Sequence, residues 1–394
     1  MQQQPEWDVA VVGGGPAGLA AAHAAAMAGA STVILERAEH PRYKTCGGGL
    51  IGASLNAVRD LPVIPAKDEI RAVTCSLRGG REFTRAEPAS GRPLLQMVMR
   101  DDFDAALLER ALAAGAKVRQ KTVVRGLSEE DGQVAIRLGD GTTVTAAVVI
   151  GADGSAGVTG RHVGVTFAQV DLGLELEIAI PPAEVPRWAG RVILDWGEIP
   201  ASYGWVFPKG DRLTVGVIAA RKTEAGPQAD ATRAYLREFV ARLGLAGHEA
   251  VRDSGHLTRC RREDAPLRAG RVIVAGDAAG LLEPWTREGI SFALRSGALA
   301  GASAAKAAAA GSPAGLASAL DEYGVAIDRG LGEEMRASRK LLAVFTRHPG
   351  FFHGAMSTRL GWRLFTRFCR SELPYQEFLQ YRYARLALSV LNRL

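Results

Sequence analysis

The N-terminal segment "WDVAVVGGGPAGLAAAHAAAMAGASTVILER" constrains the fold more than any other part of this 394-residue chain. Its pattern predicts a strand, a glycine-rich turn, an alanine-rich helix and a second strand, which together make a β-α-β unit. Gly13, Gly15 and Gly18 have the spacing G-x-G-x-x-G directly after the first strand, and Glu36 closes the second. Such glycines let a pyrophosphate approach the helix N-terminus, and the carboxylate accepts hydrogen bonds from a ribose. We therefore expect a dinucleotide site that includes Gly13, Gly15, Pro16, Ala17, Gly18, Glu36 and Arg37.

Two later segments also place a turn directly after a strand. The segment "TAAVVIGADGSAG" is a predicted buried strand that ends in Asp153 and Gly154. The segment "RVIVAGDAAGLLEPWTREGISFALRSG" predicts a strand, a turn at Gly276 and Asp277, a loop and a helix. In this order the three segments resemble the FAD-binding domain of the p-hydroxybenzoate hydroxylase superfamily. The resemblance implies that they hold one FAD together.

The same resemblance implies roles for further residues. Asp277 is suited to accept hydrogen bonds from ribityl hydroxyls, and the helix after Gly289 would direct its positive N-terminus at the flavin pyrimidine edge. Arg100 precedes an amphipathic helix and matches the flavin-contacting arginine of the superfamily, and Val124 is expected to lie against the adenine. The FAD contacts implied in these later segments are Arg100, Val124, Asp153, Gly154, Gly276, Asp277, Pro284, Gly289 and Ile290.

Strand-rich stretches lie between the FAD-binding segments. Period-two alternation and turn residues in "LGLELEIAIPP", "GRVILDWGEIP" and "YGWVFPKGDRLTVGVIAAR" predict an antiparallel sheet. The predicted fold class is therefore α/β, with a Rossmann-like FAD-binding domain, an inserted antiparallel-sheet substrate domain and a helical C-terminal region. The alanine-rich run before residue 320 predicts two helices broken at 311–313. We place the FAD-binding domain at residues 1–70, 96–165 and 256–330, the substrate domain at 71–95 and 166–255, and the basic helical region at 331–394.

Three stretches narrow the resemblance to one family: "PRYKTCGGGL", "YGWVFPKGD" and "GDAAGLLEPWTREGISFALRSG". They are similar to the geranylgeranyl reductase family, flavoenzymes that hydrogenate isolated carbon–carbon double bonds in polyprenyl chains of lipids, chlorophyll precursors or quinones. The Cys-Gly-Gly turn of that family lies near the flavin ring, and its aromatic strand lines the lipid cavity. The resemblance therefore implies flavin contacts from Cys46, Gly47 and Gly49, and a substrate wall made of Tyr203, Trp205, Phe207 and Pro208.

Two departures from the family pattern concern this site. Pro200 stands three residues before Tyr203, where the family commonly has proline two before. Arg287 stands where the family more often has glycine, and we expect it to bind a phosphate or carboxylate of the substrate. Hydrogenation adds a hydride from the flavin and a proton, so the site needs a well-placed acid. Cys46 and then Tyr203 are the candidates, and packing of Cys46 as a small apolar residue is the alternative.

Other functions are compatible with the same fold. A flavin-dependent monooxygenase or halogenase is one alternative, and Lys67 is the candidate for the lysine that halogenases carry downstream of the fingerprint. A flavoprotein that binds or senses without turnover, or a non-redox isoprenoid cyclase, represents another class. No second β-α-β unit with a G-x-G-x-x-G turn follows the first, which argues against a second nucleotide domain. The expected electron donor is therefore NAD(P)H bound transiently, or reduced ferredoxin.

Positive charge is concentrated near the C-terminus. Residues 333–394 contain 11 Lys+Arg and 4 Asp+Glu, against 37 and 38 upstream. A basic, aromatic-rich surface fits peripheral contact with anionic lipid on the inner face of the membrane, and ordinary helix packing is the alternative. Nucleic acid is not an expected partner, and no apolar run reaches the roughly 18 residues of a spanning helix. Four scattered cysteines and the absence of a leader before "WDVAVVGGG" predict a cytoplasmic protein without a disulfide framework or metal site.

Overall fold

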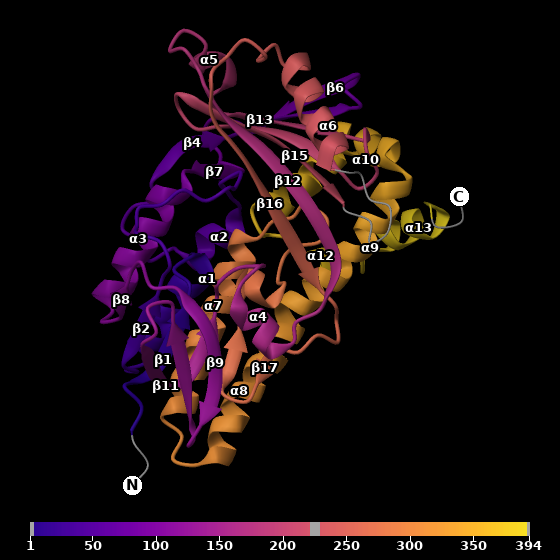
Figure 1. Cartoon of the computed structure of the whole chain (residues 1–394). Helices are drawn as coiled ribbons and strands as arrows, with labels where there is room; N and C mark the ends of the chain where they lie inside the picture. Colours follow the sequence, from indigo (N-terminus) through magenta and orange to yellow (C-terminus); the bar gives the residue numbers. More distant parts are fainter. Residues whose placement is uncertain (1–3, 221–228, 392–394) are drawn as a thin grey trace.

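The computed structural model describes residues 4–220 and 229–391 (Figure 1). Within these residues the strands form three sheets, with helices packed on and between them. The predicted α/β class and the helical C-terminal region are confirmed. Arg221, which ends one predicted strand, and residues 392–394 of the predicted helical region lie outside the described residues.

The largest sheet contains the predicted β-α-β unit. Its central strands follow the order β18-β11-β1-β2-β8 and are all parallel, which is the arrangement that helical crossovers produce. Strand β17 extends one edge, and β9 and β10 form an antiparallel ribbon beside β11. The strands of this sheet are β1 (Trp7–Val12), β2 (Thr32–Leu35), β8 (Lys117–Arg119), β9 (Val124–Glu130), β10 (Gln133–Leu138), β11 (Thr143–Gly151), β17 (Arg268–Ala269) and β18 (Val272–Val274).

Helix α1 (Pro16–Met27) packs closely against α7 (Ile290–Ala308). The approach depends on glycine, because a Cβ atom at Gly297 would lie 2.1 Å from the carbonyl oxygen of Ala17. Gly301, one turn further along α7, allows the same close contact with α1. The packing holds the N-terminal end of α7 beside the glycine-rich turn that precedes α1.

The second sheet is largely antiparallel, as predicted, and contains one parallel pair of strands. Its order is β16-β12-β15-β14-β13-β5-β6, and β13 pairs with β5 in parallel. No hairpin fixes the direction of these two strands, because they lie far apart in the chain. Helix α6 (Ala229–Arg242) covers one face of this sheet, and Phe239 packs against Gly204 there. The strands are β5 (Ala72–Leu77), β6 (Arg81–Ala86), β12 (Phe167–Ala179), β13 (Arg191–Trp196), β14 (Tyr203–Pro208), β15 (Arg212–Ala220) and β16 (Ala250–Arg261).

A small third sheet ties the Cys-Gly-Gly turn to the rest of the chain. Its central strand β7 (Leu95–Val98) pairs with β3 (Gly49–Leu50), which follows the turn, and with β4 (Ala66–Ile70). Strand β7 leads directly into α3 (Arg100–Ala113), so that the first residue of this helix lies near the turn. The shorter helices that precede α7 are α2 (Gly52–Ala57), α4 (Val158–Val163), α5 (Val185–Trp188) and the 3-10 turn η1 (Gly276–Ala279).

The C-terminal helices extend from the largest sheet to the second sheet (Figure 1, orange to yellow). Helix α7 and the next helix are separated at the predicted break, and α10 packs on β5 and β6. Among the described residues, no helix is both long and apolar enough to span a bilayer. The predicted domain boundaries stay a prediction. The helices are α8 (Pro313–Ile327), the π-helical turn η2 (Asp328–Gly332), α9 (Glu333–Arg347), α10 (Pro349–Ser357), α11 (Arg359–Cys369), α12 (Tyr375–Phe378) and α13 (Arg382–Leu391).

Candidate active site

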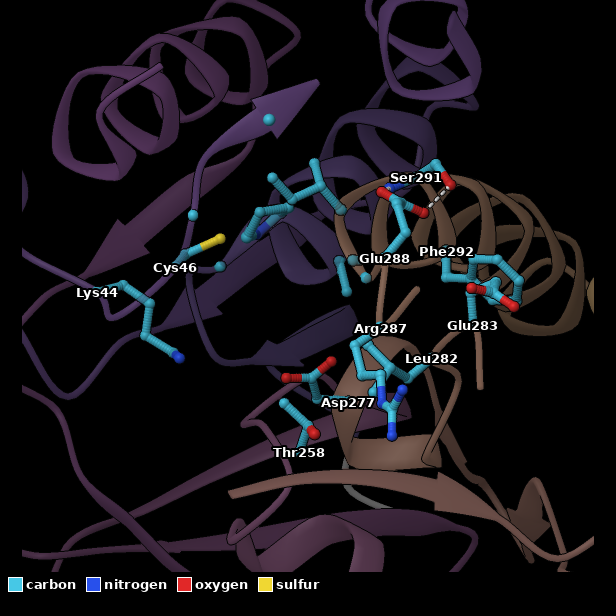
Figure 2. A pocket seen from close by; sticks show the side chains of 18 of the residues that line it. Lys44, Cys46, Thr258, Asp277, Leu282, Glu283, Arg287, Glu288, Ser291 and Phe292 are labelled. Carbon is cyan, nitrogen blue, oxygen red and sulfur yellow. Dashed lines mark hydrogen bonds between the residues drawn. The ribbon is translucent and has the colours of Figure 1, made fainter. Parts of the chain in front are cut away.

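A cavity of about 1240 Å³ is lined by residues of the largest sheet, the second sheet and the C-terminal helices. Pockets for a single small ligand usually measure roughly 300–1,000 Å³, so this cavity has room for a cofactor and a second molecule. Figure 2 shows part of its wall, where Lys44 and Cys46 lie across from Asp277 and Glu288.

Most of the residues predicted from the sequence line this cavity. Four predicted residues do not line it, namely Gly18, Pro208, Gly276 and Pro284. Gly18 instead permits helix packing, because a Cβ atom there would lie 1.9 Å from the carbonyl oxygen of Gly13. The predicted residues that line the cavity are Gly13, Gly15, Pro16, Ala17, Glu36, Arg37, Cys46, Gly47, Gly49, Arg100, Val124, Asp153, Gly154, Tyr203, Trp205, Phe207, Asp277, Arg287, Gly289 and Ile290.

Glu36 organises the end of the cavity near the glycine-rich turn. Its carboxylate accepts hydrogen bonds from the backbone N–H of Gly14 and, at 2.8 Å, of Ala38. Arg42 forms an ion pair with the same carboxylate at 3.7 Å. Glu36 is 4% exposed and fixed by these partners, so its remaining acceptor capacity faces the cavity, as a ribose contact requires.

Asp277 lies in a cluster of ionisable groups that the sequence only partly predicted. Nε2 of His256 lies 3.8 Å from its carboxylate, and both residues line the cavity. Burial raises the pKa of Asp277, but His256, Lys44 and Arg100 together hold it below its ordinary value. Asp277 is therefore an ionised acceptor in the wall of the cavity, and its contact with the ribityl chain stays a prediction. His256 was missed because it belongs to no motif, and Lys44, two residues before Cys46, lies in the "PRYKTCGGGL" stretch but was not singled out as a contact.

The turn that carries Cys46 is held through both of its backbone polar groups. The N–H of Cys46 donates to Oε1 of Glu175 at 2.8 Å, and Nζ of Lys209 donates to its carbonyl oxygen at 3.4 Å. Burial alone would lower the pKa of Arg100, but Asp104 and then the Cys46 side chain hold it above its ordinary value. The thiol thus lies beside a buried cation at the edge of the cavity.

The predicted aromatic row forms a wall of the cavity. The ring centroids of Tyr203 and Trp205 lie 5.8 Å apart, and those of Trp205 and Phe207 lie 6.2 Å apart. Gly47 packs directly on this row, because a Cβ atom there would lie 2.7 Å from the Phe207 ring. The Cys-Gly-Gly turn and the aromatic strand therefore meet, although they are far apart in the sequence.

The C-terminal region supplies a second aromatic wall that the sequence reasoning missed. Trp285 lies 5.5 Å from Phe345 and 5.4 Å from Phe352, measured between ring centroids. In "HPGFFHGAMSTRLGWRLFTRFCR" the spacing of Trp362, Phe365 and Phe368 was a usable signal, since it places these rings on one side of a helix. The C-terminal residues that line the cavity include Phe345, Phe352, Met356, Phe365, Phe368 and Tyr375.

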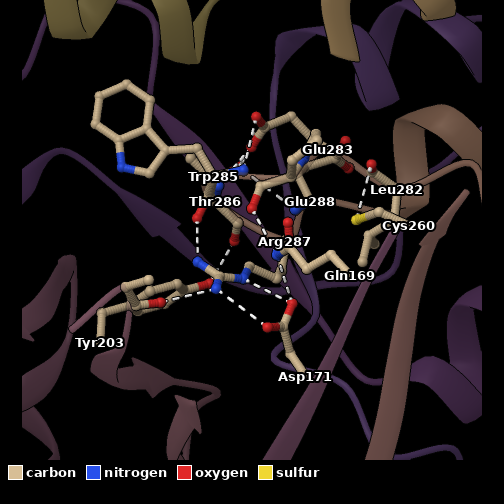
Figure 3. Close-up of polar contacts among 12 residues, drawn as sticks. Gln169, Asp171, Tyr203, Cys260, Leu282, Glu283, Trp285, Thr286, Arg287 and Glu288 are labelled. Atoms are coloured by element: carbon tan, nitrogen blue, oxygen red, sulfur yellow. Dashed lines mark hydrogen bonds and ion pairs between the residues drawn. The ribbon is translucent and has the colours of Figure 1, made fainter. Parts of the chain in front are cut away.

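Arg287 is held by an unexpected partner on the second sheet (Figure 3). Its Nε donates to Oδ2 of Asp171 at 3.1 Å, and its terminal nitrogens donate to the carbonyl oxygens of Ala201 at 2.7 Å and Trp285 at 2.6 Å. The hydroxyl of Tyr203 donates to the carbonyl oxygen of Thr286 in the same loop. These bonds use most of the guanidinium N–H groups, so a substrate anion would have to compete with them for Arg287. Binding of such an anion by Arg287 stays a prediction.

Two carboxyl groups close to the N-terminus of α7 also face the cavity. Glu283 accepts hydrogen bonds from the backbone N–H groups of Trp285 and Thr286, which folds the loop before α7. Glu288 accepts a hydrogen bond from the N–H of Ser291 at 2.7 Å, in the first turn of α7. Burial raises the pKa of Glu288 to about 7, although its bonds to Ser291 oppose the shift. Both side chains shape the loop that carries Arg287.

The sequence matches known proteins over most of its length. Residues 6–324 match the family described as FAD binding domain. The chain is 31% identical to a digeranylgeranylglycerophospholipid reductase of Methanocella arvoryzae, over 87% of this chain and 88% of the relative. It is 32% identical to a menaquinone reductase of Mycolicibacterium smegmatis over 74% and 75%. It is 30% identical to a chloroplastic geranylgeranyl diphosphate reductase of Oryza sativa subsp. japonica, over 73% of this chain and 64% of the relative.

Solved structures share the fold over nearly the whole chain. A geranylgeranyl bacteriochlorophyll reductase-like protein from Thermoplasma acidophilum has a TM-score of 0.77 and 24% identity, covering 98% of this chain and 99% of that one. A flavin-dependent brominase has a TM-score of 0.74 and 18% identity, with the same coverage of both chains. The structural likeness therefore establishes the fold and does not by itself separate reductases from halogenases.

Proposed function

The chain belongs to the geranylgeranyl reductase family of FAD-dependent oxidoreductases that act on carbon–carbon double bonds, and we propose that its substrate is a polyprenyl chain. The proposed reaction hydrogenates isolated double bonds of a geranylgeranyl-type chain carried by a lipid, a quinone or a related isoprenoid. The named relatives that act on such molecules support this proposal.

The observation that carries the proposal is the aromatic lining of the cavity beyond the dinucleotide residues. The row on β14 and the rings of α9, α10 and α11 line one cavity with the Cys-Gly-Gly turn. An isoprenoid chain offers apolar surface along its whole length, and burial contributes about 25 cal/mol per Å² of it. A flat polar substrate would leave most of this wall without a partner.

The residues that would hold the FAD belong to all three predicted segments. The turn before α1 and the carboxylate of Glu36 suit its pyrophosphate and ribose, and Asp277 suits its ribityl hydroxyls. When bound and reduced, FAD supplies the hydride. The chain then has to align the double bond, exclude water and provide a proton. The two aromatic walls serve the first two tasks, and the sequence-based candidates for the third are Cys46 and Tyr203.

Anaerobic turnover of the purified flavoprotein tests the proposal. The bound FAD is reduced with dithionite, a geranylgeranyl lipid is added, and both the flavin spectrum and the mass of the lipid are followed. We expect reoxidation of the flavin and a gain of two mass units per reduced bond. If no polyprenyl substrate reoxidised the flavin, the proposed reductase activity would be excluded.

The same preparation separates the alternative functions. Aerobic incubation with an aromatic substrate, with and without bromide, would yield an oxygenated or halogenated product from a monooxygenase or halogenase. Lys67 is not among the residues that line the cavity, and it pairs with Asp102 at 2.8 Å. A protein that only binds or senses would show neither product. We expect product only from the anaerobic reaction with the lipid.

The electron donor stays a prediction, and NAD(P)H and reduced ferredoxin are the two candidates. Each is mixed anaerobically with the oxidised flavoprotein, and the rate of flavin bleaching is compared. The donor whose rate exceeds the turnover number with lipid is the competent one. Peripheral contact with membrane lipid through the basic C-terminal helices is also part of the proposed function, since it would bring the protein to lipid substrates.

A further inference from the structure

Strand β12 carries two buried carboxyl groups whose roles differ. Glu175 and Glu177 alternate with leucines, so both project from the same face of the strand. Each is 2% exposed. A carboxylate this deeply buried is costly unless it is paired, hydrogen-bonded or protonated. The partners of the two groups show which of these applies to each.

Glu177 is the acidic member of a buried ion pair. Nζ of Lys209 lies 3.6 Å from its Oε1, and the hydroxyl of Thr214 donates to the carboxylate at 3.0 Å. Glu177 does not line the cavity. Its negative charge therefore has a direct counter-ion and no access to a bound molecule.

Among the described residues, the hydrogen-bond donors to Glu175 are neutral groups, and its side chain lines the cavity. Its Oε1 accepts the N–H of Cys46 at 2.8 Å and the hydroxyl of Tyr43 at 3.0 Å. Burial raises the pKa of Glu175, Lys209 opposes the shift and Glu177 adds to it. Glu175 is thus a carboxyl group that can bind a proton inside the wall of the cavity.

Hydrogen bonds connect this carboxyl group with the outer part of the second sheet. The hydroxyl of Tyr43 lies 2.9 Å from Oγ of Ser254, a partly exposed residue on β16. Burial raises the pKa of Tyr43, so this group stays a neutral hydroxyl that can donate to Glu175 while it accepts from Ser254. The guanidinium carbon of Arg252 lies 4.0 Å from the centroid of the Tyr43 ring on the outer side.

We propose that Ser254, Tyr43 and Glu175 form the path by which a proton enters the cavity, and that Glu175 delivers it to the substrate. The inference rests on the proposed function, because reduction of a double bond consumes one proton per turnover. A cavity that excludes water needs a fixed route for this proton.

The atoms and electrons balance along this path. One alkene carbon gains hydrogen and an electron pair as hydride from the reduced FAD, and the other gains the proton from the carboxyl group of Glu175. The glutamate O–H bond breaks, and the carboxylate takes a proton from Tyr43 as Tyr43 takes one from Ser254. Ser254 is refilled from solvent water. The groups that act on Glu175 directly are Tyr43, Lys44, Cys46, Glu177 and Lys209, and the charge of Arg252 lies against the Tyr43 ring.

The test uses three variants, Glu175→Gln, Tyr43→Phe and Ser254→Ala. For each one, FAD binding, flavin reduction and flavin reoxidation by the substrate are measured separately. We expect each to retain FAD and to be reduced by dithionite at the wild-type rate. Reoxidation by the polyprenyl substrate should slow about 100-fold or more in E175Q, the range for loss of a general acid. Y43F and S254A should slow this step about tenfold, because refilling of the acid is impaired.

The pH dependence of flavin reoxidation distinguishes two roles of Glu175, delivery of a proton and mere support of the Cys46 turn. Glu175 must carry a proton to donate one, so wild-type reoxidation should slow as the pH rises through its raised pKa. E175Q should lose this dependence and the solvent deuterium isotope effect. The control Glu177→Gln removes a buried charge from the same strand face. It should retain the isotope effect and the pH dependence, with the latter shifted to lower pH because Glu177 raises the pKa of Glu175. Asp253→Asn, an exposed neighbour of Ser254, is the control for S254A.

Each remaining outcome decides the proposal. Reoxidation of E175Q at the wild-type rate overturns it, and so does a slower variant that keeps the wild-type pH profile. If the variants do not fold, infrared difference spectra of the wild-type protein before and after reoxidation decide, since a carboxyl band must change. An unchanged carboxyl region overturns the path. A wild-type protein that reduces no polyprenyl substrate overturns both this inference and the proposed function.

Discussion

At the scale of single residues, Arg287 has a backbone conformation that is unusual for a residue with a long side chain. Its φ angle is 58°, in the left-handed region that glycine adopts most readily, and the family more often has glycine there. Such strain costs of order 1–3 kcal/mol and persists only when surrounding contacts hold it. Asp171 provides that contact from β12, so the loop before α7 is fastened to the second sheet.

Breaking this buried pair should destabilise the protein strongly. We expect Arg287→Met to lower the free energy of unfolding by about 3–5 kcal/mol, because it leaves the buried carboxylate of Asp171 without its counter-charge. The double variant R287M/D171N should lose less than the sum of the single losses, by about 1 kcal/mol or more. Urea denaturation of the four proteins measures the coupling.

An exposed pair gives the matched comparison for Arg287 and Asp171. Arg262 lies 3.1 Å from Asp264, but both side chains are largely solvated. Exposed ion pairs contribute little, so the same cycle at this pair should show no measurable coupling. Equal coupling at both pairs, or strict additivity at Arg287 and Asp171, would contradict the interpretation of Arg287 as a clamp.

Individual cofactor residues were predictable where a local motif encodes them. The glycines of the fingerprint, Glu36 and Asp277 lie in short strand–turn–helix patterns, and the structure places them around one cavity or directly behind it. Glu175 was not predicted, because a polar residue inside an alternating strand has the same pattern whether it faces solvent or a buried network. The partner of Arg287 was missed for the same reason, since only the folded chain brings β12 to the loop.

At the scale of elements, α13 carries an apolar face that the described residues leave about half exposed or more. Tyr383, Leu386 and Val390 are 48%, 68% and 51% exposed, and their spacing places them on one side of the helix. Arg382 and Arg385 lie in the same helix. Amphipathic helices with these features bind the interface of anionic membranes.

Replacing the apolar face of α13 should therefore weaken binding to vesicles. For Leu386→Ser combined with Val390→Ser we expect at least tenfold weaker binding to liposomes that contain anionic lipid, because two apolar contacts are lost. Wild-type binding should also fall with added salt. Sedimentation with the vesicles measures both effects.

An exposed apolar residue elsewhere provides the control for α13. Val325 is 49% exposed on α8, which lies at the lower end of the molecule in Figure 1, away from α13. Val325→Ser should leave vesicle binding unchanged. Equal binding by the α13 variant and the wild-type protein would show that this helix does not dock.

At the scale of the whole molecule, three parts of the chain that are distant in sequence enclose one cavity. The largest sheet contributes the dinucleotide residues, the second sheet the row of rings on β14, and the C-terminal helices the opposing rings. The strand and helix content followed from periodicity, but this closure depends on long-range packing that no local pattern encodes. The C-terminal helices thus serve as a wall of the site, whether or not they also contact lipid.

The closure by the C-terminal helices should protect the reduced flavin from solvent and oxygen. Phe352 lines the cavity and packs on Trp285, whereas its neighbour Phe351 is 48% exposed and does not line it. We expect Phe352→Ala to lower kcat/KM for a short polyprenyl substrate about tenfold or more, because the double bond is aligned less well. In air it should also produce more hydrogen peroxide per double bond reduced.

Phe351→Ala removes the same side chain one residue away, so it isolates the effect of the cavity wall. Measured without vesicles, this variant should keep the wild-type kcat/KM and peroxide yield. If F351A and F352A behave alike, the C-terminal helices act only through stability, and the enclosure of the site must depend on the two sheets. If only F352A shows a lower kcat/KM and more hydrogen peroxide per double bond reduced, the helical region is part of the active site. Removing this region would then convert the reductase into an oxidase.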